Sequence, residues 1–374
     1  MFKNSVTVAH VLGIPIRLHV SFLLILPFMA FVIGNNIGAI ADMAAVPSEE
    51  IAVHPYALGL ILASLLFVSV ALHELSHSLV AIRQGMRING ITLMLLGGVA
   101  EIDDEAAERD EMWMALAGPL FSLALGLVLL FLVRPALRSM SGDLRVVIYY
   151  LGYMNIFLAA FNLIPAFPSD GGRVLRSLIA RRTSYLRATQ LATSIGKGFA
   201  LLFALFGFLI GNLILVLVAF FIYMGASSEY QVNLLRDVFS DLAVSDLMTR
   251  DVASVNPSDS VTELMNRMVE ERHSGYPVVD ETGDLIGCVT LGDIRERSSG
   301  DPDEEFVEDI MSRDLITVSP EEDLYSAFSK LSEAEIGRLM VVKGGALVGI
   351  LTRSDIMKAY QVKELREERR RMHA

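Results

Sequence analysis

Every long apolar run in this 374-residue chain lies within residues 1–230. A helix needs about 20 mostly apolar residues to cross the hydrocarbon core of a bilayer, and six runs approach that length. Hydrophobic residues make up 53% of the chain, and its mean hydropathy is +0.50. These features predict a membrane protein whose N-terminal part is embedded in the bilayer and whose remainder, residues 231–374, is soluble.

The six predicted membrane spans lie near residues 20–41, 56–82, 112–133, 146–164, 188–209 and 211–227. Gly207, Gly211 and Asn212 favour a tight turn between the last two spans, although one long tilted helix is the alternative. With both termini inside, ten Lys and Arg residues of the short loops lie inside and three outside, in agreement with the positive-inside rule. The sequence therefore predicts a multi-pass protein of the cell membrane with cytoplasmic N- and C-termini.

Charge is distributed as unevenly as hydrophobicity. Residues 1–230 contain 14 Lys and Arg and 14 Asp and Glu, so the net charge of −12 comes entirely from residues 231–374. An acidic soluble part argues against nucleic-acid binding, which needs clustered basic residues. Cys288 is the only cysteine of the chain, which excludes an intrachain disulfide and a cysteine-based metal site.

The strongest motif is His73-Glu74-Leu75-Ser76-His77, within the second predicted span. On a helix, His73 and His77 are one turn apart, so both imidazoles project from one face and can bind one metal ion. Glu74 lies beside them, where it can accept a proton from a water molecule that zinc makes acidic. A chance match is the alternative, but three ionisable residues in an apolar span are costly and indicate a functional site.

Two histidines leave zinc without the third protein ligand that catalytic zinc sites use. The best candidate is Asp170, because Pro165 and Pro168 interrupt the fourth span just before it. A plain turn at a helix end is the alternative for Asp170. Asn162, near the same break, is expected either to hold a substrate carbonyl or the oxyanion with its amide, or to cap the helix. We therefore expect one zinc ion per chain.

Residues 88–102, between the second and third spans, are too few to cross the membrane. Their β-prone side chains and the pair Gly97 and Gly98 predict a hairpin or a re-entrant segment. Backbone of this kind occurs at membrane depth only where protein covers it or where it lines a wet cavity. The expected fold class is a polytopic α-helical membrane protein with a short membrane-associated β segment.

Residues 243–362 contain an internal repeat. Residues 247–251 parallel residues 310–314 at an offset of 63, and residues 287–293 parallel residues 349–355 at an offset of 62. Each unit combines short strands with helices, which predicts a soluble α/β module of two similar domains. We expect the domains of the whole chain at residues 1–230, 243–300 and 306–362.

The first two thirds of the chain resembles the site-2 proteases, a family of polytopic intramembrane zinc metalloproteases. The resemblance rests on the His-Glu-Leu-Ser-His motif within a span and on the Asn…Pro…Asp-Gly run from Asn162 to Gly171. It rests also on the Gly-Gly segment at residues 97–98 and on an Ala-Gly-Pro run that contains Gly118 and Pro119. By themselves, these last two residues would be interpreted as a packing contact and a helix kink.

This resemblance implies cleavage of the transmembrane helices of other proteins. It implies His73, His77 and Asp170 as the zinc ligands and Glu74 as the catalytic base. It also implies that the segment containing Gly97 and Gly98 pairs with an unwound strand of the substrate.

The repeat resembles a tandem pair of cystathionine-β-synthase (CBS) domains. The matching positions are two Gly-x-x-Thr-x-x-Asp runs, with Thr290 and Asp293 in the first and Thr352 and Asp355 in the second. CBS pairs usually pack into a disc with clefts for adenine nucleotides, where the hydroxyl and the carboxylate would contact phosphate and ribose. The resemblance implies a site for ATP, ADP or AMP and a homodimer through this module. A structural pair with empty clefts is the alternative.

These motifs favour a regulated intramembrane protease, whose partners would be the lipid bilayer and a membrane-anchored protein substrate, with no nucleic acid. The first alternative is a channel or transporter regulated by the CBS pair, with a non-catalytic zinc site. A transport path does not call for Glu74 between two histidines together with a distant Asp170 at a proline break, whereas zinc hydrolysis does. A second alternative, a zinc-binding receptor without catalysis, has no need of Glu74.

Overall fold

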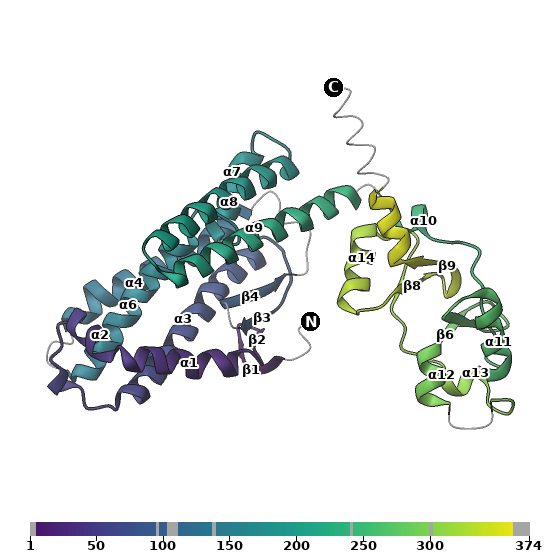
Figure 1. Ribbon diagram of the computed structural model, residues 1–374, viewed down its shortest axis with the longest axis horizontal. Helices are drawn as coiled ribbons and strands as arrows, with labels where there is room; N and C mark the ends of the chain where they lie inside the picture. Colours follow the sequence, from purple (N-terminus) through teal and green to yellow (C-terminus); the bar gives the residue numbers. More distant parts are fainter. Residues whose placement is uncertain are drawn as a thin grey trace. The chain divides into compact units, whose positions relative to one another are not determined.

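The computed structural model describes residues 5–94, 97–102, 111–136, 140–239, 242–298 and 302–361. The chain divides into two compact units, Met1–Gln231 and Val232–Ala374. The first is a bundle of long helices with a small sheet, and the second is an α/β module (Figure 1). The polytopic helical fold and the α/β module predicted from the sequence are therefore both present.

The helical elements of the first unit follow its apolar runs. They are α1 (Phe22–Asn35), α2 (Ile37–Met43), the short η1 (Ser48–Glu50), α3 (Pro55–Arg83), α4 (Glu111–Leu127), the π-helical η3 (Val128–Val133), α5 (Arg134–Ala136), α6 (Gly142–Asn162), α7 (Asp170–Ala180), α8 (Tyr185–Leu209) and α9 (Leu213–Phe239). Within the described residues, five helical stretches are long and apolar enough to cross a membrane, and a bent pair brings the number to as many as six.

That bent pair is the first predicted span, residues 20–41. α1 ends at Asn35, α2 begins at Ile37, and their axes differ by 63°. Asn36 between them leaves helical geometry, and its side-chain amide donates a hydrogen bond of 2.8 Å to the carbonyl of Val32. The apolar run predicted a span here, but hydrophobicity alone carries no signal of a bend.

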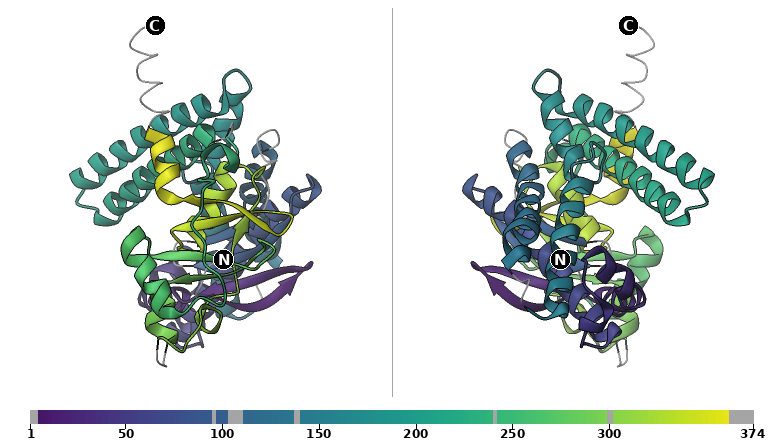
Figure 2. Two further views of the ribbon diagram at one scale, coloured as in Figure 1. Left: turned by 90° about the vertical axis from the view of Figure 1, so that its right-hand side faces the viewer. Right: turned by 90° about the vertical axis from the view of Figure 1, so that its left-hand side faces the viewer.

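The last two spans are separate helices that lie side by side in Figures 1 and 2. α8 ends at Leu209, and Gly211 takes the left-handed φ of +68° in the turn that follows. The side chain of Asn212 then accepts a hydrogen bond of 3.1 Å from the backbone N–H of Leu215 at the start of α9. Of the two arrangements considered from the sequence, the structure has the tight turn.

The sheet of the first unit has four strands in the order β1-β2-β3-β4. They are β1 (Ser5–Val11), β2 (Ile14–His19), β3 (Ile88–Met94) and β4 (Gly97–Ile102). β1 pairs with β2 and β3 with β4 in antiparallel fashion, whereas β2 and β3 are parallel. The segment at residues 88–102 is thus a hairpin, whose connecting residues 95 and 96 lie outside the described part of the chain.

The sequence analysis did not predict the hairpin β1–β2, drawn in purple in Figure 2. Its signal is the apolar alternation of Ile14, Ile16 and Leu18, which is typical of a strand with one covered face. Gly13, with a φ of +84°, makes the turn before it.

The sheet packs against α3. Ile91 and Leu93 of β3 are almost fully buried and belong to the same hydrophobic cluster as Leu75 of α3. Leu75 lies inside the His-Glu-Leu-Ser-His motif, so this packing brings the sheet to the turn of α3 that carries the motif.

The second unit contains two similar halves. Its elements are α10 (Val244–Leu247), α11 (Val261–Glu271), β5 (Gly275–Val279), β6 (Leu285–Thr290), α12 (Leu291–Arg297), α13 (Val307–Ile310), β7 (Thr317–Val318), α14 (Leu324–Glu333), β8 (Arg338–Lys343), β9 (Ala346–Thr352) and a final helix at residues 353–361. β5 and β6 form one sheet, and β7, β8 and β9 form the other. Each half has its own core, with Leu264 and Tyr276 in one and Leu324 and Leu339 in the other.

Candidate metal centre

The helix α3 holds both histidines of the motif in the interior of the first unit. It runs without interruption from Pro55 to Arg83, so His73 and His77 lie one turn apart on one face. His73 is 2% exposed and His77 is 8% exposed. Two polar rings at such depth need polar partners, because burial without them is costly.

Asp170 reaches the two histidines from another part of the chain. α6 ends at Asn162, and the chain turns through its two prolines before Asp170 opens α7. One oxygen of Asp170, Oδ2, lies 3.2 Å from Nε2 of His73 and 3.2 Å from Nε2 of His77. The ligand atoms of the three residues all lie within 4.8 Å of one another.

These distances fit a zinc ion. Bonds of about 2.0–2.1 Å in tetrahedral geometry place neighbouring ligand atoms about 3.3 Å apart. The other ring nitrogens are already engaged, since Nδ1 of His73 lies 2.9 Å from Oγ of Ser122 and Nδ1 of His77 lies 2.7 Å from the carbonyl oxygen of Met114. Partners at Nδ1 orient an imidazole so that Nε2 is left for the metal.

Gly118 on α4 faces the same point in space. A Cβ atom at this position would lie 2.3 Å from Nε2 of His77 and 2.6 Å from Nε2 of His73. Any larger residue would occupy the volume into which both imidazoles point. Gly118 therefore does more than allow packing and a kink, which was its interpretation from the sequence: it leaves room for whatever the imidazoles bind.

The strand β4 lies directly against Glu74. A Cβ atom on Gly98 would lie 2.5 Å from Cγ of Glu74, so only glycine lets the backbone come so close. Gly97 beside it has a φ of +133°, which also favours glycine. β4 is the edge strand of the described sheet, and no hydrogen bond from the described residues reaches the Glu74 carboxylate.

Asn162 is not part of this cluster in the structure. Its side-chain nitrogen donates a hydrogen bond of 3.0 Å to the carbonyl of Leu158, one turn earlier on α6. The amide is thus hydrogen-bonded within its own helix in this structure.

Two residues near the centre were not singled out from the sequence. Ser122, fully buried, follows Gly118 by one helical turn and so shares its face of α4. Asn155 on α6 is also fully buried and donates a hydrogen bond of 3.0 Å to Ser69, which precedes His73 by one turn of α3. The available signal for both was an isolated polar residue within an apolar span.

In the second unit, Thr290 and Asp293 form a capping box at the start of α12. The Thr290 hydroxyl donates to Oδ2 of Asp293 at 2.6 Å, and the backbone N–H of Asp293 donates to Oγ1 of Thr290 at 3.3 Å. The other carboxylate oxygen, Oδ1, accepts a hydrogen bond of 3.1 Å from Ser312.

Burial, with the nearby charge of Asp293, raises the pKa of the Cys288 thiol, so the only cysteine is not a reactive thiolate near neutral pH.

Thr352 and Asp355 repeat this arrangement with one difference. The Thr352 hydroxyl donates to Oδ2 of Asp355 at 2.6 Å. Within the part of the chain that the structure describes, Oδ1 of Asp355 has no hydrogen-bond or ion-pair partner. The two runs are therefore alike as helix caps, but only the second keeps a carboxylate oxygen available.

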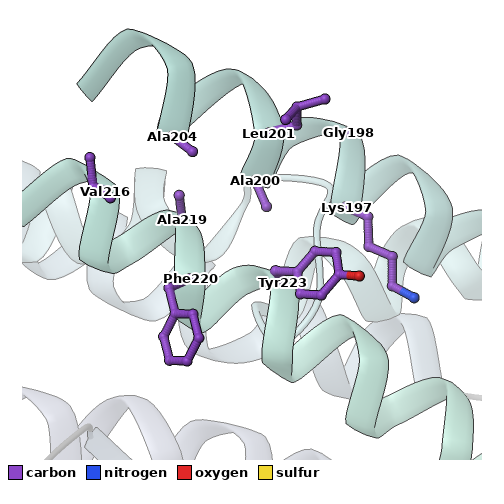
Figure 3. Close-up of a pocket in the computed structure, with 9 residues that line it drawn as sticks. All are labelled: Lys197, Gly198, Ala200, Leu201, Ala204, Val216, Ala219, Phe220 and Tyr223. Carbon is purple, nitrogen blue, oxygen red and sulfur yellow. The ribbon is translucent and has the colours of Figure 1, made fainter. Parts of the chain in front are cut away.

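A groove of about 560 Å³ lies between α8 and α9 in the first unit (Figure 3). Small and apolar side chains line most of it. Lys197 is its only charged lining residue, and its Nζ lies 5.5 Å from the ring centroid of Tyr223. The groove contains none of the three residues of the metal cluster, so it is separate from the candidate metal centre.

Comparisons with known proteins give consistent results. The model of peptidase family M50 matches residues 61–142 and 134–205, and the CBS domain model matches residues 244–300 and 307–362. A zinc metalloprotease of Methanocaldococcus jannaschii is 37% identical over 364 residues, which cover 97% of this chain and 98% of that protein.

Solved structures match each part of the chain separately. A site-2 protease from Methanocaldococcus jannaschii is 39% identical and covers 61% of this chain and 95% of that one, with a TM-score of 0.43. A CBS-pair protein from Arabidopsis thaliana is 30% identical and covers 33% of this chain and 96% of that one, with a TM-score of 0.30.

The apolar helices and the zinc-metalloprotease relative, which matches nearly the whole chain, define a membrane-embedded zinc metalloendopeptidase. The chain belongs to peptidase family M50, the site-2 proteases, and carries a tandem pair of CBS domains after its protease unit.

Proposed function

We propose that this enzyme hydrolyses peptide bonds within the transmembrane segments of membrane-anchored proteins, as a step of regulated intramembrane proteolysis. In this proposal His73, His77 and Asp170 are the zinc ligands and Glu74 is the catalytic base. The observation that carries it is the approach of Nε2 of both histidines to one oxygen of Asp170, at 3.2 Å each. Glu74 follows His73 directly on the same helix.

The proposed chemistry divides the work among few residues. When bound, zinc supplies Lewis acidity and lowers the pKa of a water molecule toward neutrality. Glu74 takes a proton from the attacking water at its carboxylate and later gives it to the nitrogen of the leaving amine. Asn162 holds the substrate carbonyl or the oxyanion after its amide leaves the carbonyl of Leu158.

The proposed substrate must unwind near the bond that is cut, because helical backbone groups are shielded and already hydrogen-bonded. The edge strand β4 supports this step, since an edge presents unpaired N–H and C=O groups that an extended peptide can join. Gly97 and Gly98 are the part of β4 that we expect to pair with the substrate. Their closeness to Glu74 would bring the paired strand to the proposed base.

We propose that both termini are cytoplasmic, which places the end of α3 at Arg83, and with it the metal centre, toward the cytoplasm. The proposed domain limits are residues 1–230 for the protease and residues 243–300 and 306–362 for the two CBS domains.

The CBS pair is proposed to bind ATP, ADP or AMP, to modulate cleavage and to support a homodimer. The unpartnered oxygen of Asp355 supports a ligand site in the second CBS domain.

The test is the zinc content of purified full-length protein. About one zinc per chain is expected, because the cluster is a single three-ligand site. His73→Ala, His77→Ala and Asp170→Ala should each lose most of it. His54→Ala is the matched control, because His54 is exposed at the start of α3. Full zinc occupancy in Asp170→Ala would show that the third ligand is misassigned.

A further inference from the structure

A buried arginine lies two turns after Asp170 on α7. Arg176 is 4% exposed, and its guanidinium is shared by two carboxylates from other helices. Its Nε donates to Glu111, the first residue of α4, at 3.1 Å, and its Nη2 donates to the other oxygen of the same carboxylate. Its Nη1 donates to Glu229 of α9 at 2.6 Å.

Buried charges such as Arg176 and Glu111 are costly unless every group is paired. Here the planar guanidinium binds Glu111 with two hydrogen bonds and Glu229 with a third, and the rings of Phe167 and Tyr185 lie 4.9 Å and 4.7 Å from its central carbon. A guanidinium held on all sides in this way can take only one position. The cluster therefore fixes α7 relative to both α4 and α9.

α9 also contacts the loop just before Asp170. A Cβ atom on Gly225 would lie 2.7 Å from Cδ of Pro168, and Ala226 is buried in one cluster with Phe167. Gly225 and Glu229 are one turn apart, so the same face of α9 touches the chain before Asp170 and the arginine after it. Asp170 thus sits between two points that α9 holds.

We propose that Arg176 is a positioning residue of the metal centre. Together with Glu111 and Glu229, it fixes the start of α7 so that the Asp170 carboxylate stays at bonding distance from the metal that both histidines hold. Arg176 is about 9 Å from Asp170 along the helix axis, so it acts through α7 and does not touch the metal. The proposal rests on the proposed role of Asp170 as a zinc ligand.

Two variants test the cluster without removing the central charge. Arg176→Lys keeps the charge but lacks the planar fork that binds both carboxylates. Glu229→Gln removes only the negative charge of the partner on α9, whose side chain is 28% exposed, and leaves the pair of Arg176 with Glu111 intact. Arg182→Lys is the matched control, because Arg182 is exposed just beyond the end of α7.

The probe is Co²⁺, titrated into the metal-free full-length protein while its visible absorption bands are recorded, since these bands report ligand number and geometry. Wild type and Arg182→Lys should give the same bands and the same affinity. Arg176→Lys and Glu229→Gln should shift the bands and weaken Co²⁺ binding by about 10- to 100-fold, as loss of outer partners does at metal sites.

The outcomes separate the two proposals when Asp170→Ala is titrated in parallel. If Asp170→Ala loses the wild-type bands while Arg176→Lys and Glu229→Gln keep the wild-type bands and affinity, Arg176 does not position the ligand. If Asp170→Ala itself keeps the wild-type bands, the proposed ligand set is wrong. If Arg176→Lys does not fold, Glu229→Gln alone decides, because the buried ion pair of Arg176 with Glu111 remains in that variant.

Discussion

At the scale of single residues, the candidate metal centre depends on groups that orient its proposed ligands. Ser122 and the carbonyl of Met114 each contact Nδ1 of one histidine, at 2.9 Å and 2.7 Å. Gly118 leaves open the volume toward which the two Nε2 atoms point. Both proposed histidine ligands are therefore oriented by α4, which contributes none of the three proposed ligands.

Ser122→Ala should lower the zinc affinity by about 10- to 100-fold, because His73 loses the partner that fixes its ring. The measurement is zinc retention against increasing concentrations of a chelator. Ser194→Ala is the control, since Ser194 is exposed on α8 and bonds only its own helix. Equal retention by Ser122→Ala and wild type would mean that the hydroxyl does not orient the imidazole.

Gly118→Ala should bind little zinc, because the added methyl group would overlap Nε2 of both histidines. Gly198→Ala on α8 should bind as wild type does, since the same atom would meet open space there. Metal analysis of the two purified variants makes the comparison. Full zinc content in Gly118→Ala would contradict the close approach of α4.

The sequence predicted that His73, His77 and Asp170 come together, because helical spacing pairs the two histidines and catalytic zinc calls for a third protein ligand. It did not predict the roles of Gly118 and Ser122. Those roles depend on which helix packs against α3, and local hydrophobic periodicity does not identify the partner of an apolar face.

At the scale of elements, the sheet determines what lies against the proposed base. Arg17 of β2 pairs with Glu101 of β4 at 3.0 Å, and Thr92 of β3 donates to the same carboxylate at 3.1 Å. These contacts cross three strands and hold the edge strand β4 in register. The hairpin β3–β4 was predictable from local residues, whereas the parallel pairing of β2 with β3 joins distant segments and was not.

Gly98→Ala should reduce cleavage on the order of 10²-fold, because displacement of reacting groups by about 1 Å has effects of that size. The new Cβ atom would lie 2.5 Å from Cγ of Glu74, so either β4 or the base must move. Zinc content should stay at the wild-type value, since Glu74 is not a proposed ligand. Gly38→Ala, in open space on α2, is the control. Wild-type cleavage by Gly98→Ala would count against the closeness of β4 and Glu74.

At the scale of the whole molecule, α9 belongs to both units. Glu229 lies in the part of α9 that belongs to the first unit, whereas Val238 and Phe239 at its end are buried in one core with Leu324 of the second unit. A ligand of the CBS pair can change cleavage only if it binds two states of the enzyme with different affinities.

Asp355→Ala should weaken nucleotide binding by the full-length protein more than Asp293→Ala does. Oδ1 of Asp293 already accepts a hydrogen bond from Ser312, whereas Oδ1 of Asp355 has no partner among the described residues. Calorimetric titration with ATP, ADP and AMP gives both affinities. Binding that depends more on Asp293, or no binding of any nucleotide, would be the contrary result.

The large-scale organisation was the most predictable part, because it follows from composition. Apolar runs indicated the spans, and the repeat at residues 243–362 indicated the two similar halves. The bend at Asn36 and the buried cluster of Arg176 were not predicted. Both arise from contacts or backbone geometry that leave the hydrophobic pattern unchanged.

The most direct measurement of the central claim is cleavage of a transmembrane substrate by Glu74→Gln, with the zinc content determined on the same sample. The variant should keep about one zinc per chain, because the proposed ligands are intact. It should lose about 10²- to 10⁴-fold in rate, because no group remains to accept the proton of the attacking water. Cleavage at the wild-type rate by zinc-loaded Glu74→Gln would contradict the mechanism.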